Sequence, residues 1–252
     1  MKLVLSEKLE PQLQQEGLRE FEKEIRSIRG DLRAQTKKIE IPSGGWISIE
    51  YDGEDSEVFT EALNRRYGTA AIQFSRLELG DTYRGFVVSS GKVGYGLYID
   101  IGILSPSKRD GLYPLHRMRA QLVDGEVQSL RQIAGRFCLY DGLPLNIRIE
   151  GLENAERISL ALTERQESFF KDWEKYPFDR VVVIGELTGR VEAALRKVGL
   201  SKDIVGVERL SLASSILTCK LGTEAPGVIS KLGPSITAAK LYPFIPRTKT
   251  RK

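Results

Sequence analysis

The stretch "GKVGYGLYIDIGI", residues 91–103, combines four glycines, a lysine and two tyrosines, which are residue types that bind phosphate or stack on rings. A dinucleotide-binding loop requires the order G-x-G-x-x-G between a strand and a helix. Here the order is G-x-x-G-x-G, and the run continues into β-branched and aromatic residues rather than into helix formers. Lys92 precedes most of the glycines, so the G-x-x-x-x-G-K-[ST] order of a phosphate-binding loop is absent as well. The stretch therefore predicts a bent β-strand, not a nucleotide site.

A second candidate for a nucleotide site, "VVVIGELTGRV" at 181–191, does run from a strand into a helix. It contains only Gly185 and Gly189 and lacks the third glycine of the fingerprint. His116 is the single histidine of the chain, so a multi-histidine metal site and a two-histidine mechanism are excluded. His116 next to Arg117 is interpreted as a surface residue. We accordingly predict no catalytic residues, no metal and no cofactor.

Alternation along 95–103 predicts one apolar face, made of Tyr95 with Leu97, Ile99, Ile101 and Ile103, that would line a small barrel. Tyr98 belongs to the opposite face, and a β-bulge near Gly96 would turn both tyrosines outward. The preceding "DTYRGFVVSSGKVG" predicts the other strand of a hairpin, with Gly85 in its middle.

The totals fit a globular chain, with 252 residues, 41% hydrophobic and 29% charged residues. No apolar run reaches the roughly 18 residues of a membrane span, and the apolar stretch near the N-terminus is too short for a signal peptide. Cys138 and Cys219 lie far apart and form no CxxC pattern, so we predict reduced, packed cysteines in a cytoplasmic protein.

The chain divides into three segments, 1–75, 76–165 and 166–252. The first predicts a strand, a helix ending at Gly30, a hairpin around "PSGG", a helix over 56–67 and a last strand in "AIQFSRL". The last predicts the order βαββαβ, which is the ferredoxin-like arrangement, and the first segment is either a second copy or a partial one. "TERQESFFKDWEKYP" at 163–177 predicts a connecting helix that packs its aromatic residues between domains; an exposed stacking surface is the alternative.

The middle segment resembles the ribosomal S-one-type RNA-binding domain, an OB-fold barrel. Four landmarks occur in the order of that family: "LGDTYRGFVVSSGKVGYGLYIDIG", "DGLYPL", and, at the end, the strands of "GLPLNIRIEG" and "RISLAL". The segment departs from the family in a longer basic insertion at 116–141, and in Pro114 at a position where the family often has histidine. The whole chain is similar to an uncharacterised archaeal family with α/β parts on both sides of such a barrel. The fold class is therefore α+β, with three small domains and a central S-one-like barrel.

The resemblance implies that single-stranded RNA crosses one face of the barrel, where aromatic residues stack on bases. The matched positions are Tyr95, Tyr98 and Arg157. Basic residues nearby complete the candidate RNA-binding set: Lys92, Arg84, Lys108, Arg109, Arg117 and Arg119. Arg131 and Arg136 add to the basic character of the insertion.

Charge is distributed unevenly, with net −3 over residues 1–75, 0 over 76–169 and +7 over 170–252. A basic C-terminal part, ending in "RTKTRK", suits phosphate backbones, while the acidic N-terminal part suits a basic ribosomal or RNA-processing protein. The sequence predicts a non-enzymatic, cytoplasmic protein that binds single-stranded or ribosomal RNA in translation or RNA processing. Two alternatives stay open: an adaptor whose barrel binds no RNA, and an enzyme with a site in a cleft between domains.

Overall fold

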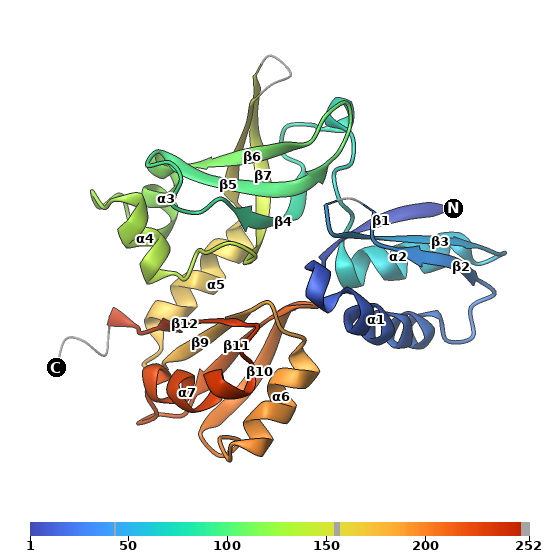
Figure 1. The fold of residues 1–252 in the computed structure, drawn as a ribbon. Helices are drawn as coiled ribbons and strands as arrows, with labels where there is room; N and C mark the ends of the chain where they lie inside the picture. Colours follow the sequence, from blue (N-terminus) through green and yellow to red (C-terminus); the bar gives the residue numbers. More distant parts are fainter. Residues whose placement is uncertain (43, 154–156, 248–252) are drawn as a thin grey trace.

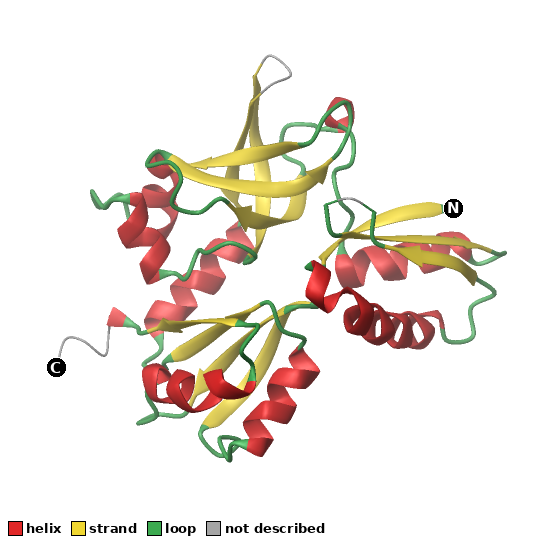
Figure 2. Cartoon of the chain, in the orientation of Figure 1, coloured by secondary structure: helices red, strands yellow, loops and turns green. Residues whose placement is uncertain are grey.

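A computed structural model describes residues 1–42, 44–153 and 157–247. Three parts follow each other along the chain: an N-terminal sheet with two helices, a closed barrel, and a C-terminal sheet with two helices (Figure 1). The fold is mixed α+β, as predicted (Figure 2). Among the described residues, no helix has the length and apolar character that crossing a membrane requires.

The barrel has five strands in the closed order β4-β5-β6-β8-β7. Their bounds are Thr82–Val88 (β4), Gly96–Ile103 (β5), Arg109–Pro114 (β6), Pro144–Glu153 (β7) and Arg157–Leu162 (β8). All neighbouring pairs are antiparallel except β6 and β8, which run parallel. The predicted insertion forms two short helices, α3 (Leu115–Leu122) and α4 (Leu130–Arg136), between β6 and β7. The hairpin of β4 and β5 is confirmed, with Val88 opposite Tyr98.

Two glycines of the opening stretch are required by packing within the protein, Gly96 inside the barrel and Gly102 against the N-terminal part. At Gly96 an added Cβ would meet the Tyr113 carbonyl oxygen of β6 at 2.6 Å. At Gly102, φ is +89° and a Cβ would meet the Ala70 side chain at 2.7 Å. Both sites demand close backbone approach, which only glycine permits.

The N-terminal sheet has the order β1-β3-β2 and is antiparallel throughout. Its elements are β1 (Lys2–Lys8), the 3₁₀ turn η1 (Pro11–Leu13), α1 (Gln14–Arg29), β2 (Gln35–Glu40), β3 (Trp46–Asp52) and α2 (Ser56–Tyr67). On the edge of β1 that faces away from β3, an isolated antiparallel bridge joins Leu5 to Thr69. The strand predicted in "AIQFSRL" is wrong: Phe74–Arg76 form a 3₁₀ turn, η2, and the residues before it bond in turn to β1, to Ile101 and to Ser105, so no continuous ladder forms.

The C-terminal sheet has the order β10-β11-β9-β12, again antiparallel. Its elements are β9 (Arg180–Ile184), α6 (Thr188–Lys197), β10 (Ile204–Ser211), β11 (Ser214–Cys219), α7 (Ala225–Leu232), the 3₁₀ turn η3 (Gly233–Ser235) and β12 (Lys240–Phe244). Successive residues of β9 point to opposite faces of this sheet. Val181 and Val183 pack with residues of α6 and α7, whereas Val182 and Ile184 face the core that contains the barrel.

Helix α5 (Glu164–Lys175) joins the barrel to the C-terminal sheet and packs between them (Figure 1). Phe170 and Trp173 are buried, and Trp173 lies 5.0 Å from the ring of Phe244 on β12. The predicted connecting helix with aromatic residues between domains is confirmed; Tyr176, by contrast, is exposed. One hydrophobic core thus runs from the barrel through α5 into the C-terminal sheet, and a second joins the N-terminal helices to Leu187, Leu212 and Ala213. Shared cores of this kind fix the three parts relative to each other.

Candidate RNA-binding surface and the cleft between domains

The barrel carries an exposed pair of tyrosines at the start of β5. Tyr95 is 55% exposed and Tyr98 is partly buried. Their rings are 6.5 Å apart in an edge-on arrangement, and their hydroxyl oxygens are 2.8 Å apart. The predicted inward direction of Tyr95 is wrong, because Tyr95 precedes the first residue of β5 and lies outside the regular alternation. The sequence left open whether both tyrosines face outward, and Tyr95 does so without a bulge at Gly96, which pairs in register with Pro114.

Arg157 and Lys92 are the basic candidates whose side chains have no hydrogen-bond or ion-pair partner among the described residues. Arg157 opens β8 and is exposed, and its charge acts on the Tyr98 phenol. The pKa of Tyr98 is raised, first by the hydrogen bond with Tyr95; the Arg157 charge opposes this shift. Lys92 is exposed in the turn between β4 and β5. Together these residues form what we call the tyrosine surface: Tyr95, Tyr98, Lys92 and Arg157.

Lys108 and Arg109 lie near the opposite end of β5 from the tyrosine pair. Arg109 pairs with Ile103, five residues beyond Tyr98 and therefore about 16 Å along the strand. Lys108 Nζ is 3.6 Å from Asp100 Oδ2, and the Arg109 guanidinium lies 5.5 Å from the centre of the Phe74 ring. The predicted common rim of these residues with the tyrosines is wrong, because the strand carries them toward the N-terminal part.

The arginines of the insertion serve contacts within the chain. Arg117 forms an ion pair with Glu150 at 2.6 Å, and Arg119 Nε donates to the Gln128 carbonyl at 2.8 Å. Arg136 pairs with Glu174 of α5 at 2.6 Å, whereas Arg131 is exposed on α4. His116 is exposed, as predicted.

Asp100, within the "GLYIDIG" motif, is fully buried. It accepts hydrogen bonds from Lys8 Nζ of β1 at 2.7 Å and from the Gly102 amide at 2.9 Å. Lys8 also lies 5.2 Å from the centre of the Trp46 ring. This part of the motif therefore docks the N-terminal part onto the barrel.

Arg84 lies apart from the tyrosine surface, in a cleft of about 950 Å³ lined by all three parts of the chain. Its Nη1 is 3.1 Å from Glu7 Oε1, and Glu7 also accepts from the Leu212 amide at 2.9 Å. Burial raises the pKa of Glu7 although the Arg84 charge opposes the shift. Arg84 thus joins the three parts instead of contributing to the predicted barrel rim.

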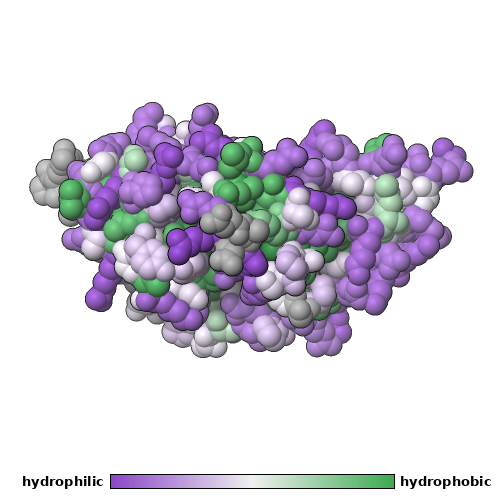
Figure 3. All heavy atoms as spheres, turned by 90° about the horizontal axis from the view of Figure 1, so that it is seen from above, coloured by the Kyte–Doolittle hydropathy of each residue, from purple (hydrophilic) through white to green (hydrophobic). Residues whose placement is uncertain are grey.

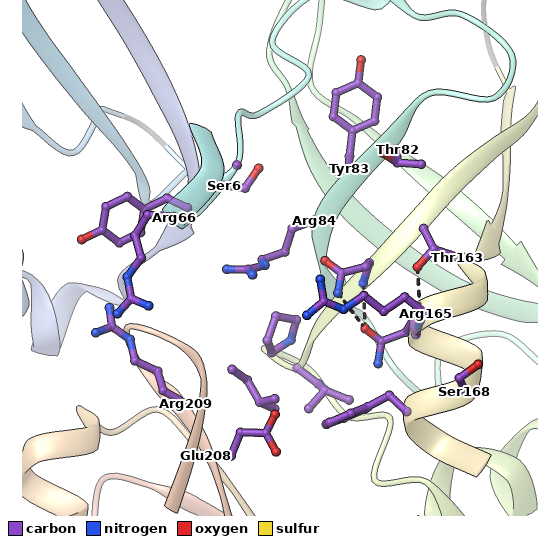
Figure 4. A pocket seen from close by; sticks show the side chains of 18 of the residues that line it. Ser6, Arg66, Thr82, Tyr83, Arg84, Thr163, Arg165, Ser168, Glu208 and Arg209 are labelled. Atoms are coloured by element: carbon purple, nitrogen blue, oxygen red, sulfur yellow. Dashed lines mark hydrogen bonds between the residues drawn. The ribbon is translucent and has the colours of Figure 1, made fainter. Parts of the chain in front are cut away.

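Four arginines approach the centre of this cleft from different elements (Figure 4). They are Arg66 at the end of α2, Arg84 on β4, Arg165 in the first turn of α5 and Arg209 on β10. Sequence reasoning missed three of the four. No local signal could have found them, because each has ordinary neighbours in the sequence and the four are drawn from the whole length of the chain.

Both cysteines are free and buried, and burial raises the pKa of Cys138 to about 12. Within residues 1–42, 44–153 and 157–247, no group of three or more His, Cys, Asp and Glu side chains is arranged to hold a metal ion.

The fold and these surfaces define a multidomain α+β protein built around a closed five-stranded barrel. Residues 77–174 match the model of the DUF2110 central domain, and residues 178–242 match that of the DUF2110 C-terminal domain. The chain belongs to the DUF2110 family, which is an uncharacterised one. No curated protein matches it.

Proposed function

We propose that the protein is a non-enzymatic RNA-binding protein of the cytoplasm that acts in translation or RNA processing. The observation that carries the proposal is the contact of the exposed Tyr95 with the partly exposed Tyr98 on a small barrel, together with Lys92 and Arg157, whose side chains have no partner among the described residues. Aromatic rings on such a surface stack on bases, and basic side chains bind phosphates. The ligand is single-stranded RNA or a single-stranded element of ribosomal RNA.

The strand order supports an OB-fold of the S-one type. Numbered from β4, the closed order is 1-2-3-5-4, with strands 3 and 5 parallel and the insertion helices between strands 3 and 4. Strands 2 and 3 of this fold form the usual binding face for single strands. Tyr98 lies on strand 2, beside Leu112 of strand 3. We assign the barrel to this class on that basis.

The folds and the charge of the flanking parts also support the proposal of RNA binding. The C-terminal order β10-β11-β9-β12, with the connectivity βαββαβ, is the order expected of a ferredoxin-like domain. The N-terminal part has the same strand order in β1, β3 and β2. Thr69 pairs with Leu5 of β1 at the position where the fourth strand of such a domain would lie. We therefore propose two ferredoxin-like domains around the barrel, of which the basic C-terminal one adds contacts to the phosphate backbone.

Substitution of Tyr98 by alanine tests the proposal. Base stacking contributes about 1–3 kcal/mol per base, so Tyr98→Ala weakens binding of an oligouridylate by about fivefold or more. Fluorescence anisotropy at low salt measures the affinity. Tyr176→Ala is the matched control, because Tyr176 is an exposed tyrosine that directly follows α5, outside the barrel. Equal affinities of the Tyr98 and Tyr176 variants would refute the stacking surface.

One observation favours the alternative of a protein-interaction adaptor. Five of the seven basic candidates already have contacts within the chain: Arg84, Lys108, Arg109, Arg117 and Arg119. On the face shown in Figure 3, however, hydrophilic residues predominate and hydrophobic ones occupy limited areas. Absence of RNA binding at low salt, together with capture of a defined ribosomal or RNA-processing protein, would establish the adaptor function.

A further inference from the structure

The cleft between the three domains has the composition of an anion-binding site. Its lining includes five arginines, the four named above and Arg65, against two acidic residues, Asp172 and Glu208. Its volume of about 950 Å³ lies within the range of sites for nucleotide-sized ligands. It is separate from the tyrosine surface, since none of Tyr95, Tyr98, Lys92 and Arg157 lines it.

Four of the five arginines have a carboxylate partner: Arg65 pairs with Glu61 at 3.8 Å and Arg66 with Glu24 at 3.7 Å, while Arg84 and Arg209 are held by hydrogen bonds. Glu7, fully buried, accepts from Arg84, and Glu24 accepts from Arg209 and from the Tyr67 hydroxyl. Burial raises the pKa of Glu24, but the hydrogen bonds from Arg209 and Tyr67 outweigh it and lower the pKa overall. A guanidinium has five N–H donors in a planar fork, so each arginine keeps donors beyond the one its carboxylate uses. Such fixed forks match the oxygens of a phosphate group.

Arg165 has no carboxylate partner among the described residues, and its guanidinium points into the cleft beside Arg84 (Figure 4). It belongs to the first turn of α5, where Thr163 caps the helix and also lines the cleft. The positive end of the helix dipole adds to the field of the arginines there. An unpaired cation beside a second one is unfavourable unless an anion joins them.

The α5 side of the cleft, which also carries Arg165, offers a surface for a base. Phe169 lines it and is partly exposed, and its ring is backed at 5.2 Å by Trp173. Asn146 and Ser168 supply hydrogen-bonding groups nearby. Arg165 and Phe169 lie four residues apart on α5, so a cation for a phosphate and an aromatic ring for a base lie side by side in the cleft.

We propose that this cleft binds the phosphate groups of a nucleotide, either free or within a single RNA strand, with Arg84, Arg165 and Arg209 as the phosphate-binding residues. The site requires all three domains to be docked. It goes beyond the proposed function, because the tyrosine surface neither lines it nor depends on it.

Calorimetric titration of the full chain with ATP, and separately with an oligouridylate of about ten nucleotides, tests the proposal. The informative variant is Arg165→Glu, which leaves no carboxylate unpaired and puts an acidic residue where the helix N-terminus favours one. Arg131→Glu is the control, since Arg131 is exposed on α4 outside the cleft. We expect Arg165→Glu to weaken binding about tenfold or more and Arg131→Glu to leave it unchanged.

The two probes distinguish the two sources of the phosphate. Weakened ATP binding in Arg165→Glu shows a site for a free nucleotide, whereas weakened oligouridylate binding alone shows a site for an RNA strand. Binding of neither probe, or equal binding by the Arg165 and Arg131 variants, overturns the proposal. Tyr98→Ala separates this outcome from the fate of the proposed function, because it affects only the tyrosine surface.

Discussion

The tyrosine surface and the arginine-lined cleft are built in opposite ways. The first comes mainly from one hairpin, and Tyr95 and Tyr98 are three residues apart in the sequence. The second draws Arg66, Arg84, Arg165 and Arg209 from four elements and all three domains. A local surface survives as long as its own domain folds, whereas a cleft between domains exists only while the domains stay docked. Three substitutions test the contacts that keep the domains docked.

Removing the aromatic ring that joins the barrel to the C-terminal sheet has the largest expected effect. Trp173 is 3% exposed, packs on Phe170 and Phe244, and accepts at its carbonyl from the buried Arg180 at 3.2 Å. Trp173→Ala leaves a cavity and lowers the free energy of unfolding by about 3–5 kcal/mol. Urea denaturation followed by circular dichroism measures the loss.

The control for Trp173→Ala is Tyr176→Ala, an exposed position in the same region, which changes stability by about 0.5 kcal/mol or less. A similar small loss for Trp173→Ala would show that α5 does not fix the two domains to each other.

Lys8→Met tests the contact between the N-terminal domain and the barrel. It leaves the buried Asp100 with the Gly102 amide and the more distant Lys108 as partners. Breaking a buried ion pair on one side costs about 3–5 kcal/mol, and since Gly102 and Lys108 still compensate Asp100 in part, we expect a loss of about 1–3 kcal/mol, which thermal unfolding detects. Asp100→Asn in the same chain removes the charge and restores part of the stability, because the amide oxygen still accepts from Gly102. If oligouridylate binding falls in Lys8→Met while stability is unchanged, Lys8 contacts RNA and does not serve docking.

Glu24→Gln has the smallest expected effect on stability, and the size of this effect depends on pH. Since hydrogen bonds lower the Glu24 pKa below its ordinary 4.5, the carboxylate stabilises the folded state above that value. The contribution is lost as the pH falls through the lowered pKa. The free energy of unfolding of the wild-type chain therefore exceeds that of Glu24→Gln by about 1 kcal/mol at neutral pH, and this difference vanishes in acid. Unfolding curves across this range provide the measurement, and a difference independent of pH would contradict the assignment.

Much of the fold followed from residue patterns, and the failures have local causes. Alternation in 95–103 predicted the hairpin and the apolar face of Leu97, Ile99 and Ile101, since a strand buried on one side must alternate. It failed at Tyr95, where the strand has not yet begun. It also gave no account of Asp100, whose partner Lys8 lies 92 residues away. Spacing reports local geometry, whereas an ion pair between domains depends on docking.

The sequence by itself determined the barrel hairpin, the connecting helix and the order of elements in the C-terminal part, because periodicity and turn chemistry act over a few residues. Only the tertiary structure decided that hydrophobic cores cross the domain boundaries and that Arg66, Arg84, Arg165 and Arg209 converge. Convergence of like charges is decided by domain packing and by buried carboxylates such as Glu7, whose partners on β4 and at Leu212 are 77 and 205 residues distant.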